Sequence, residues 1–245
     1  MPFHRWSIGI LAVACLGFTQ CAPVGPAQAA NPNAKPMNQL VIAGNACGPA
    51  AAVNALRYGS APYQAAARAI PGETDLARLE HVIQTQGCTW SQHVPQRQRW
   101  SDRGINAADL TDVINELTAK HAAPRVTLRV PSGTKVLHES YDALARSLRR
   151  GFPPVVALRR YQGVSVMDSH FIMILQVPDS LDANASEFTI RYLDPMGARV
   201  RQSIIRARSL KRHSQLIVSE PQTRTGIDPE AGSSQLIMDA LIVSP

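Results

Sequence analysis

The sequence predicts an α+β fold in which a helical layer packs on a mostly antiparallel sheet. Helical patterns fill most of the chain from about residue 39 to residue 161, and strand patterns dominate after that. Helices that precede strands, rather than alternating with them, are typical of this class. The composition, 45% hydrophobic and 18% charged, supplies enough apolar material for a core and is unlike that of a disordered chain.

Four helices are expected from apolar residues that recur every three or four positions, and from the residues that begin and end each run. The first carries Pro49 in its opening turn, where a missing N–H costs nothing, and Gly59 follows it. The expected positions are about Gly48–Tyr58, from Thr74 to Gly87, from Asn106 through Leu117, and around Tyr141–Leu148 before Gly151.

Seven strands are expected in the remaining apolar runs. The run FIMILQV lacks clean alternation of apolar and polar residues, which indicates a strand buried on both faces. Residues 220–234 have the composition of a long exposed loop before the last strand. The expected strands are Arg125–Val130, Pro154–Leu158, Phe171–Val177, Glu187–Leu193, Val200–Ile205, Leu216–Ser219 and Leu236–Val243.

The N-terminus has the features of an export signal. A short basic start at His4 and Arg5 precedes an apolar stretch, Ile8–Phe18, that is too short to span a bilayer. Ala27-Gln28-Ala29 then offers a cleavage site. We therefore expect a periplasmic or secreted protein without a transmembrane segment. Its expected parts are a signal peptide at 1–29, a mobile leader at 30–38 and one domain at 39–245.

The cysteines leave two alternatives open. Cys15 and Cys21 fall within the expected signal, and acylation of Cys21 would make the protein a lipoprotein instead. The remaining pair, Cys47 and Cys88, can form a disulfide in an oxidising compartment. Alternatively, one of the two is a reactive thiol and the other is inert.

The net charge of the chain and the motifs it contains limit which binding partners and cofactors are expected. A net charge of +7 and a pI near 9.6 predict weak attraction to anionic envelope surfaces. The densest basic stretch, Arg199–Arg212, interleaves with apolar residues as a solvated hairpin would. No stacking aromatics or known motif accompany it, so nucleic acid is not expected. Cys88 and His93 are too few ligands for a metal, and no phosphate loop occurs, so no cofactor is expected.

Three residues far apart in the chain suggest nucleophilic chemistry. Cys47 opens the first expected helix, where the helix dipole and free N–H groups favour a thiolate. Gly48 would leave room for a substrate carbonyl. His170 begins the apolar run FIMILQV, and Asp194 ends another before Pro195. A thiol, an imidazole and a carboxylate in this order can form one site if the fold brings them together.

The segments CGPAAAVNAL, SHFIMIL and LDPMG resemble those of papain-like cysteine peptidases, near the family that cleaves bacteriocin leaders after a double glycine. The resemblance spans Gln39 to Gly197 and implies a papain-like fold, with the nucleophile helix packed on the sheet. It also implies a peptide or protein substrate. In it Cys47 is the nucleophile, His170 the general base and acid, and Asp194 the residue that orients the imidazole.

The chain departs from this family at the oxyanion donor. The family usually has glutamine six residues before the nucleophile, where this chain has Val41. Gln39 and Asn45 are the two amide side chains that can replace it. Asp168 is an alternative carboxylate partner for His170, although it is nearly adjacent to it in sequence.

The resulting hypothesis is an exported cysteine peptidase that works through a thioester acyl-enzyme. Two other functions remain open. An amide-bond acyltransferase of the phytochelatin-synthase type would use the same residues and pass the acyl group to an amine. A non-catalytic peptide-binding envelope protein would keep the scaffold, and the absent upstream glutamine favours it.

Overall fold

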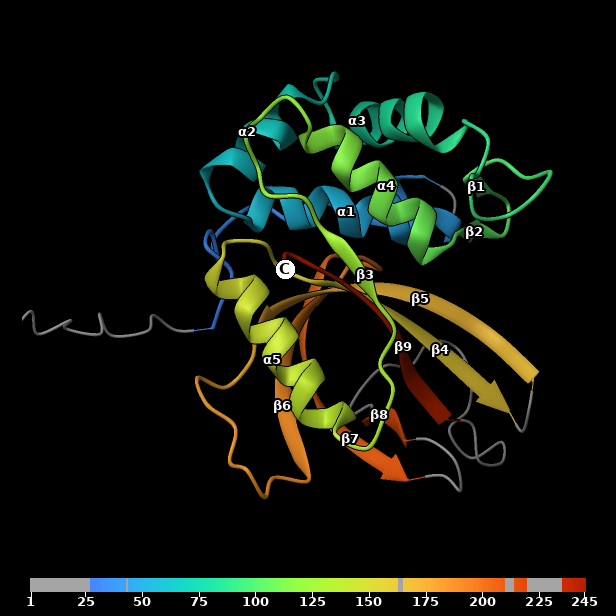
Figure 1. The fold of residues 1–245 in the computed structure, drawn as a ribbon. Helices are drawn as coiled ribbons and strands as arrows, with labels where there is room; N and C mark the ends of the chain where they lie inside the picture. Colours follow the sequence, from blue (N-terminus) through green and yellow to red (C-terminus); the bar gives the residue numbers. More distant parts are fainter. Residues whose placement is uncertain (1–26, 43, 163–164, 210–213, 220–234) are drawn as a thin grey trace, which may run out of the picture.

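The computed structural model describes residues 27–42, 44–162, 165–209, 214–219 and 235–245. Helices α1–α4 gather at one end of a curved antiparallel sheet, and α5 lies along its side (Figure 1). Most of the predicted signal peptide, including Cys15 and Cys21, lies outside the described residues. So do the 220–234 loop and part of the basic stretch, at Lys211 and Arg212.

The four expected helices form, and a fifth was missed. Thr74 caps α3 by accepting a hydrogen bond from the Ala77 N–H at 3.1 Å, and Asn106 caps α4 through the Asp109 N–H at 2.9 Å. The missed helix, α2, follows α1 after the Gly59-Ser60 break and consists largely of alanine, so it has no strong apolar stripe. The helices are α1 (Cys47–Tyr58), α2 (Ala61–Ala69), α3 (Asp75–Val82), α4 (Ala107–Thr118) and α5 (Val136–Arg149); a π-helical turn, η3 (Ile83–Gly87), extends α3.

All seven expected strands form, several of them longer than predicted. β5 begins six residues before Phe171. Its second half is buried on both faces, as the run FIMILQV predicted. A short hairpin, β1–β2, was not predicted. The strands are β1 (Trp100–Ser101), β2 (Gly104–Ile105), β3 (Thr127–Arg129), β4 (Val155–Gln162), β5 (Ser165–Gln176), β6 (Glu187–Asp194), β7 (Arg199–Ser209), β8 (Ser214–Ser219) and β9 (Gln235–Val243).

The predicted fold class is wrong. The sheet does not form a layer beneath a helical layer of the papain-like type; six strands close into an antiparallel barrel, and the helices are the smaller part of the fold. The order is β9-β4-β5-β6-β7-β8, and β8 pairs again with β9 through Ile217 and Ile237. β3 pairs with the opposite end of β9, at residues 241–243.

The closure of the barrel explains why the fold class was predicted wrongly. Apolar periodicity identifies each strand and its faces, but it does not state which strands become neighbours. The closing pair joins two strands that are separated in sequence by residues 220–234. That contact is long-range, and no turn chemistry specifies it.

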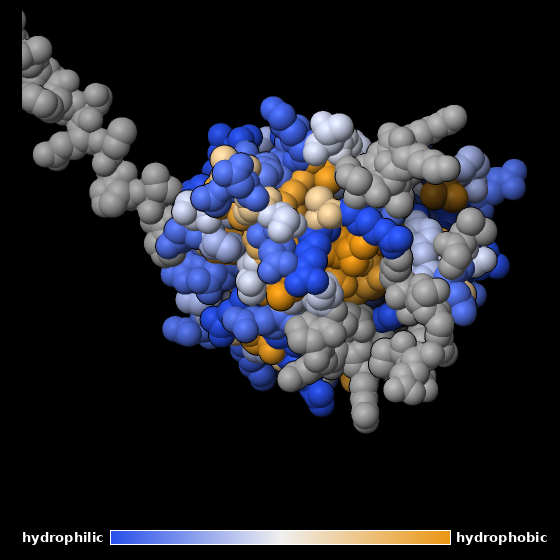
Figure 2. All heavy atoms as spheres, turned by 90° about the horizontal axis from the view of Figure 1, so that it is seen from below, coloured by the Kyte–Doolittle hydropathy of each residue, from blue (hydrophilic) through white to orange (hydrophobic). Residues whose placement is uncertain are grey.

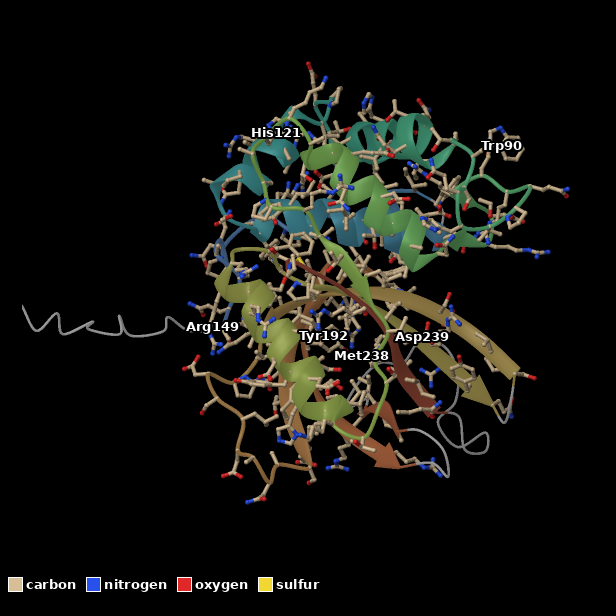
Figure 3. All side chains as sticks on the ribbon, viewed as in Figure 1. Trp90, His121, Arg149, Tyr192, Met238 and Asp239 are labelled. Carbon is tan, nitrogen blue, oxygen red and sulfur yellow. The ribbon has the colours of Figure 1, made fainter. Side chains whose placement is uncertain are left out.

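Two apolar cores lie on the two faces of the barrel wall. One packs α1, α2 and α4 against the odd-numbered residues of β4 and β5. The other fills the barrel, where the apolar face of α5 meets side chains from all six strands. Tyr192 of β6 and Met238 of β9 belong to this inner core (Figure 3). Seen from the end opposite α1–α4, apolar residues lie in a hollow between polar ones (Figure 2).

The residues just before the expected domain contact the folded part. The Ala27 carbonyl accepts a hydrogen bond from Val177 N–H at 3.0 Å, and Ala29 N–H donates to the Leu175 carbonyl at 2.7 Å, so this segment pairs antiparallel with the end of β5. Met37, in the expected mobile leader, is fully buried. The side chain of Asn54 bonds both to its N–H, at 2.7 Å, and to its carbonyl, at 3.0 Å. Export and its cleavage site stay predictions.

Among the described residues, no helix combines the length and the apolar character needed to cross a membrane.

Candidate active site

Cys47 is the first residue of α1 and is half-buried. The residue before it, Ala46, has no side chain that can cap the helix, so the N–H groups of the first turn are not engaged by the cap residue. The core helix behind Cys47 is rigidly held, because its alanines from residue 50 to residue 52 and its Val53 are fully buried. A short helical segment, η2 (Gly44–Ala46), leads directly into Cys47.

His170 and Asp194 come from the neighbouring strands β5 and β6. Since Met173 pairs with Leu193, the end of β6 reaches the part of β5 where His170 lies. Residues placed diagonally across two strands are within reach of long side chains. The Nε2 atom of His170 lies 2.8 Å from Oδ1 of Asp194. The predicted carboxylate therefore meets the predicted imidazole.

Hydrogen bonds and an ion pair fix the position of the Asp194 carboxylate. Its side chain is 4% exposed, and Oδ1 also accepts a hydrogen bond from the Met196 N–H at 2.9 Å. Oδ2 lies 3.4 Å from Nε of Arg201 on β7. A buried carboxylate that has both a cation and an N–H donor keeps a fixed orientation. Sequence reasoning missed Arg201, which it placed on a solvated hairpin.

The other side of the His170 ring engages Cys47. Burial of the ring alone would lower the pKa of His170, but hydrogen bonds from the ring to Asp194 and to the Cys47 thiol, with the charges of both groups, raise the pKa to about 10. The structure therefore brings all three predicted residues together. Because Nε2 is committed to Asp194, Nδ1 is the ring atom left for the sulfur.

This raised pKa predicts a pH dependence of folding stability. The unfolded state releases the His170 proton near pH 6.5 and the folded state only near pH 10. The stabilisation is therefore complete below pH 6.5 and is lost as the pH rises towards 10. We expect the free energy of unfolding in urea to fall between pH 7 and pH 9.5, and this component of the slope to disappear in His170→Asn. An identical slope in both proteins would contradict the pairing.

The two candidate oxyanion donors occupy different places. Gln39 lies in η1 (Gln39–Val41), which packs against η2, and its N–H donates to the Pro195 carbonyl at 2.9 Å. This places it, fully buried, beside Asp194. The side-chain amide of Asn45 instead donates to the Asp102 carbonyl in the β1–β2 hairpin. The Asn45 amide is thus engaged by the hairpin, and which residue is the oxyanion donor stays a prediction.

Asn38, which sequence reasoning did not single out, joins these segments. Its Oδ1 accepts hydrogen bonds from the Leu40 N–H and the Gly197 N–H, both at 3.0 Å. The N-terminal segment and the turn after β6 are thereby tied together around Gln39 and Asp194. An asparagine before a helical turn is a common cap signal, and that signal was present in the sequence.

Gly48 has a packing role, and its role in substrate access stays a prediction. A Cβ atom at this position would lie 2.3 Å from Cγ2 of Ile105 and 3.4 Å from the Phe171 ring. The space beside Gly48 is therefore filled by β2 and β5. A contact under 3 Å forces one of the two elements to shift.

Replacing Gly48 with alanine is expected to destabilise the protein by about 1–3 kcal/mol, because α1 can no longer approach Ile105. Urea unfolding measures the change. Ile105→Ala removes the opposing atom, so the double variant should lose less than the sum of the two single variants. Strict additivity would show that the contact does not determine the cost.

The remaining candidate residues lie outside this site. Asp168 is exposed and pairs across the sheet with Arg160, so it is not the carboxylate that contacts His170. Cys88 is exposed, and Cys47 and Cys88 are both free thiols in the structure. Trp90 projects from the outer edge of the helical part and is 69% exposed (Figure 3).

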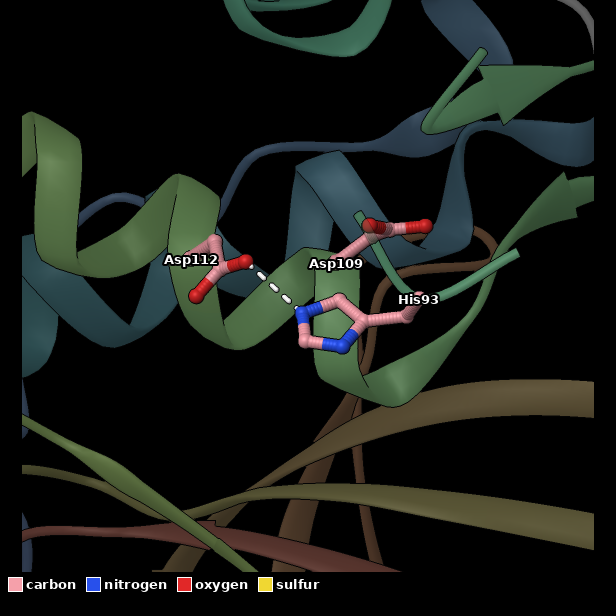
Figure 4. Close-up of side chains that lie close together, drawn as sticks. All are labelled: His93, Asp109 and Asp112. Carbon is pink, nitrogen blue, oxygen red and sulfur yellow. Dashed lines mark hydrogen bonds and ion pairs between the residues drawn. The ribbon is translucent and has the colours of Figure 1, made fainter. Parts of the chain in front are cut away.

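His93, Asp109 and Asp112 gather at the start of α4, with their ligand atoms within 4.8 Å of one another (Figure 4). The carboxylate of Asp109 is already satisfied by Ser91 Oγ, at 2.9 Å, and by the side-chain amide of Asn106. His93 Nε2 lies 2.8 Å from Asp112 Oδ2. These contacts fasten the preceding loop to the helix, and we assign no metal to them.

Comparison with protein-family models, with curated proteins and with solved structures gave no match. The geometry of Cys47, His170 and Asp194 is therefore the basis for assigning a function.

Proposed function

We propose that the protein is a cysteine peptidase that cleaves peptide bonds through Cys47, His170 and Asp194. The observation that supports the proposal is the position of the His170 ring, which bonds to the buried Asp194 carboxylate through Nε2 and also to the Cys47 thiol. A histidine with a pKa near 10 keeps its proton at neutral pH. A protonated imidazole beside a sulfur at a helix N-terminus stabilises the thiolate form that attacks carbonyls.

Each group then has one role. The Cys47 thiolate attacks the carbonyl carbon of the scissile bond, and the negative charge on the carbonyl oxygen is stabilised by the Cys47 N–H and the side chain of Gln39. His170 gives its proton to the leaving amine as the C–N bond breaks and a thioester forms. Asp194 holds the ring in place throughout.

Hydrolysis of the thioester completes the cycle. His170, now neutral, takes a proton from water, and the resulting hydroxide attacks the thioester carbonyl. The C–S bond breaks, a carboxylic acid leaves, and the thiolate and protonated His170 are regenerated. If an amine replaces water at this step, the enzyme is an acyltransferase. Product masses with and without added glutathione distinguish the two reactions.

Selective alkylation tests the proposal, with the second thiol as an internal standard. At pH 5.5 an ordinary thiol is almost entirely protonated, while a thiolate paired with a protonated imidazole still reacts. We expect iodoacetamide to modify Cys47 at least about tenfold faster than Cys88, although Cys88 is the more exposed. Peptide mapping by mass spectrometry measures both rates in one sample.

Two results would contradict the proposal. Modification of Cys88 at the same rate as Cys47 would show that Cys47 is not activated. Rapid modification of Cys47 that persists in His170→Asn would show that the imidazole is not the activating group.

A further inference from the structure

The helical part carries a cavity of about 410 Å³ where the ends of α1 and α2 meet the start of α3. Arg57, which lines it, is ten residues after Cys47 in the same helix. At 1.5 Å per residue the two lie roughly 15 Å apart along the axis. The cavity is therefore separate from the candidate active site, and its volume is in the range of small-molecule sites.

Charged side chains dominate the lining of this cavity. Four are cationic and two are acidic, which leaves an excess of two positive charges in a concave space. Such a concentration of one sign of charge raises the local concentration of the opposite ion. The charged lining residues are Lys35, Arg57, Arg68, Arg78, Glu73 and Asp75.

Arg57 and Asp75 form an ion pair within the lining. The Nη2 atom of Arg57 lies 2.6 Å from Oδ1 of Asp75, and Nη1 donates to the Lys35 carbonyl at 3.3 Å. The hydrogen bond from Arg57 lowers the pKa of Asp75, so this carboxyl stays ionised and keeps Arg57 in place. This pair therefore forms part of the wall of the cavity and engages two of the nitrogen atoms of Arg57.

Most N–H groups of the other three cations have no hydrogen-bond acceptor in the described part of the chain. Among the described residues, no hydrogen bond or ion pair involves Nζ of Lys35 or the Arg68 guanidinium. Arg78 uses only its Nε, which donates to the Gly72 carbonyl at 2.9 Å. Glu73 and Asp75 are the two acidic side chains that balance the four cationic ones of the lining, and the charges of Lys35 and Arg78 also lower the pKa of Asp75.

The backbone near the cavity repels an anion less than a bare helix end would. The last carbonyls of a helix carry partial negative charge and would repel one. Asn31 covers two of them at the end of α1: its side-chain amide donates to the Arg57 carbonyl at 3.0 Å, and its N–H donates to the Tyr58 carbonyl at 2.9 Å.

We propose that this cavity binds a phosphate group, either inorganic phosphate or the phosphate of a monoester. A phosphate monoester carries about −1.5 to −2 charges at neutral pH, which matches the two excess positive charges, whereas a single carboxylate would neutralise only one. Guanidinium groups also fit the oxygen spacing of phosphate with paired N–H donors. This site is independent of the proposed peptidase activity.

Isothermal titration calorimetry of the full chain tests whether the cavity binds phosphate. Inorganic phosphate and glycerol 1-phosphate are the separate probes, and sodium chloride at matched ionic strength is the blank. We expect saturable binding of one phosphate group per chain. The double variant Lys35→Ala/Arg68→Ala is expected to bind at least about tenfold more weakly. Arg129→Ala removes an exposed charge on β3 and serves as the control that binds normally.

Thermal unfolding without ligand shows whether the double variant has lost the binding site or the fold. Lys35 and Arg68 are exposed, so their replacement should leave the unfolding temperature unchanged. Binding of the monoester alone identifies a larger phosphorylated ligand, and binding of both probes identifies the phosphate group itself. Heat that does not exceed the chloride blank, or equal affinity in the double variant and in wild type, would overturn the proposal. Neither outcome depends on peptide hydrolysis.

Discussion

Cys47→Ala is expected to abolish peptide hydrolysis, with a loss of at least about 10⁴-fold in kcat/KM, because no other described side chain can form the thioester beside His170. The fold should survive the change. Cys47 is half-buried at the first position of α1, and alanine is an excellent helix former. Hydrolysis of a peptide library, followed by mass spectrometry, measures the rate.

The chain supplies a matched control for this experiment. Cys88→Ala removes the other thiol described in the structure, which is exposed and lies in the loop after η3. It should leave kcat/KM unchanged. Full activity in Cys47→Ala would refute the nucleophile, and loss of activity in both variants would point to a link between the two thiols.

Local rules predicted most of the elements. The caps at Thr74 and Asn106 and the apolar run of β5 are short-range signals, and each lies where the sequence placed it. The closed barrel and the helix α2 were not predicted. The barrel depends on the meeting of Ile217 and Ile237, and α2 is formed by alanines that are helical without a marked pattern.

The residues of the candidate site also divide into those that short-range signals reveal and those that long-range contacts place. Cys47 and Asp194 were predicted because each begins or ends an element, a position that local signals reveal. His170 was predicted because it directly precedes the apolar run FIMILQV, although the structure places it inside β5. The surroundings of Asp194 were not predicted, since Arg201 approaches it through the pairing of β7 with β6. The packing role of Gly48 was not predicted for a similar reason: its neighbours Ile105 and Phe171 are distant in sequence. Residues that act through partners on other elements need the three-dimensional structure.

Asp194→Ala is expected to lower kcat/KM by about 10³–10⁴-fold, because the His170 ring loses the acceptor that fixes its orientation and tautomer. Asp194→Asn should be milder. An amide oxygen can still accept from Nε2, but it carries no charge and turns an N–H₂ group towards Arg201. Asp168→Asn, an exposed carboxylate two residues from His170, is the matched control and should retain full activity.

The pH profile separates this orienting role from simple loss of folding. Asp194 raises the pKa of His170 through its hydrogen bond and its charge, so the neutral amide should lower that pKa. The protonated ring is then lost at a lower pH, and the alkaline limb of kcat/KM, expected near pH 10 in the wild type, should move towards neutrality in Asp194→Asn. A variant that was merely less well folded would lose activity at every pH without moving the limb. An unmoved limb in a folded Asp194→Asn protein would show that Asp194 does not control the charge of His170.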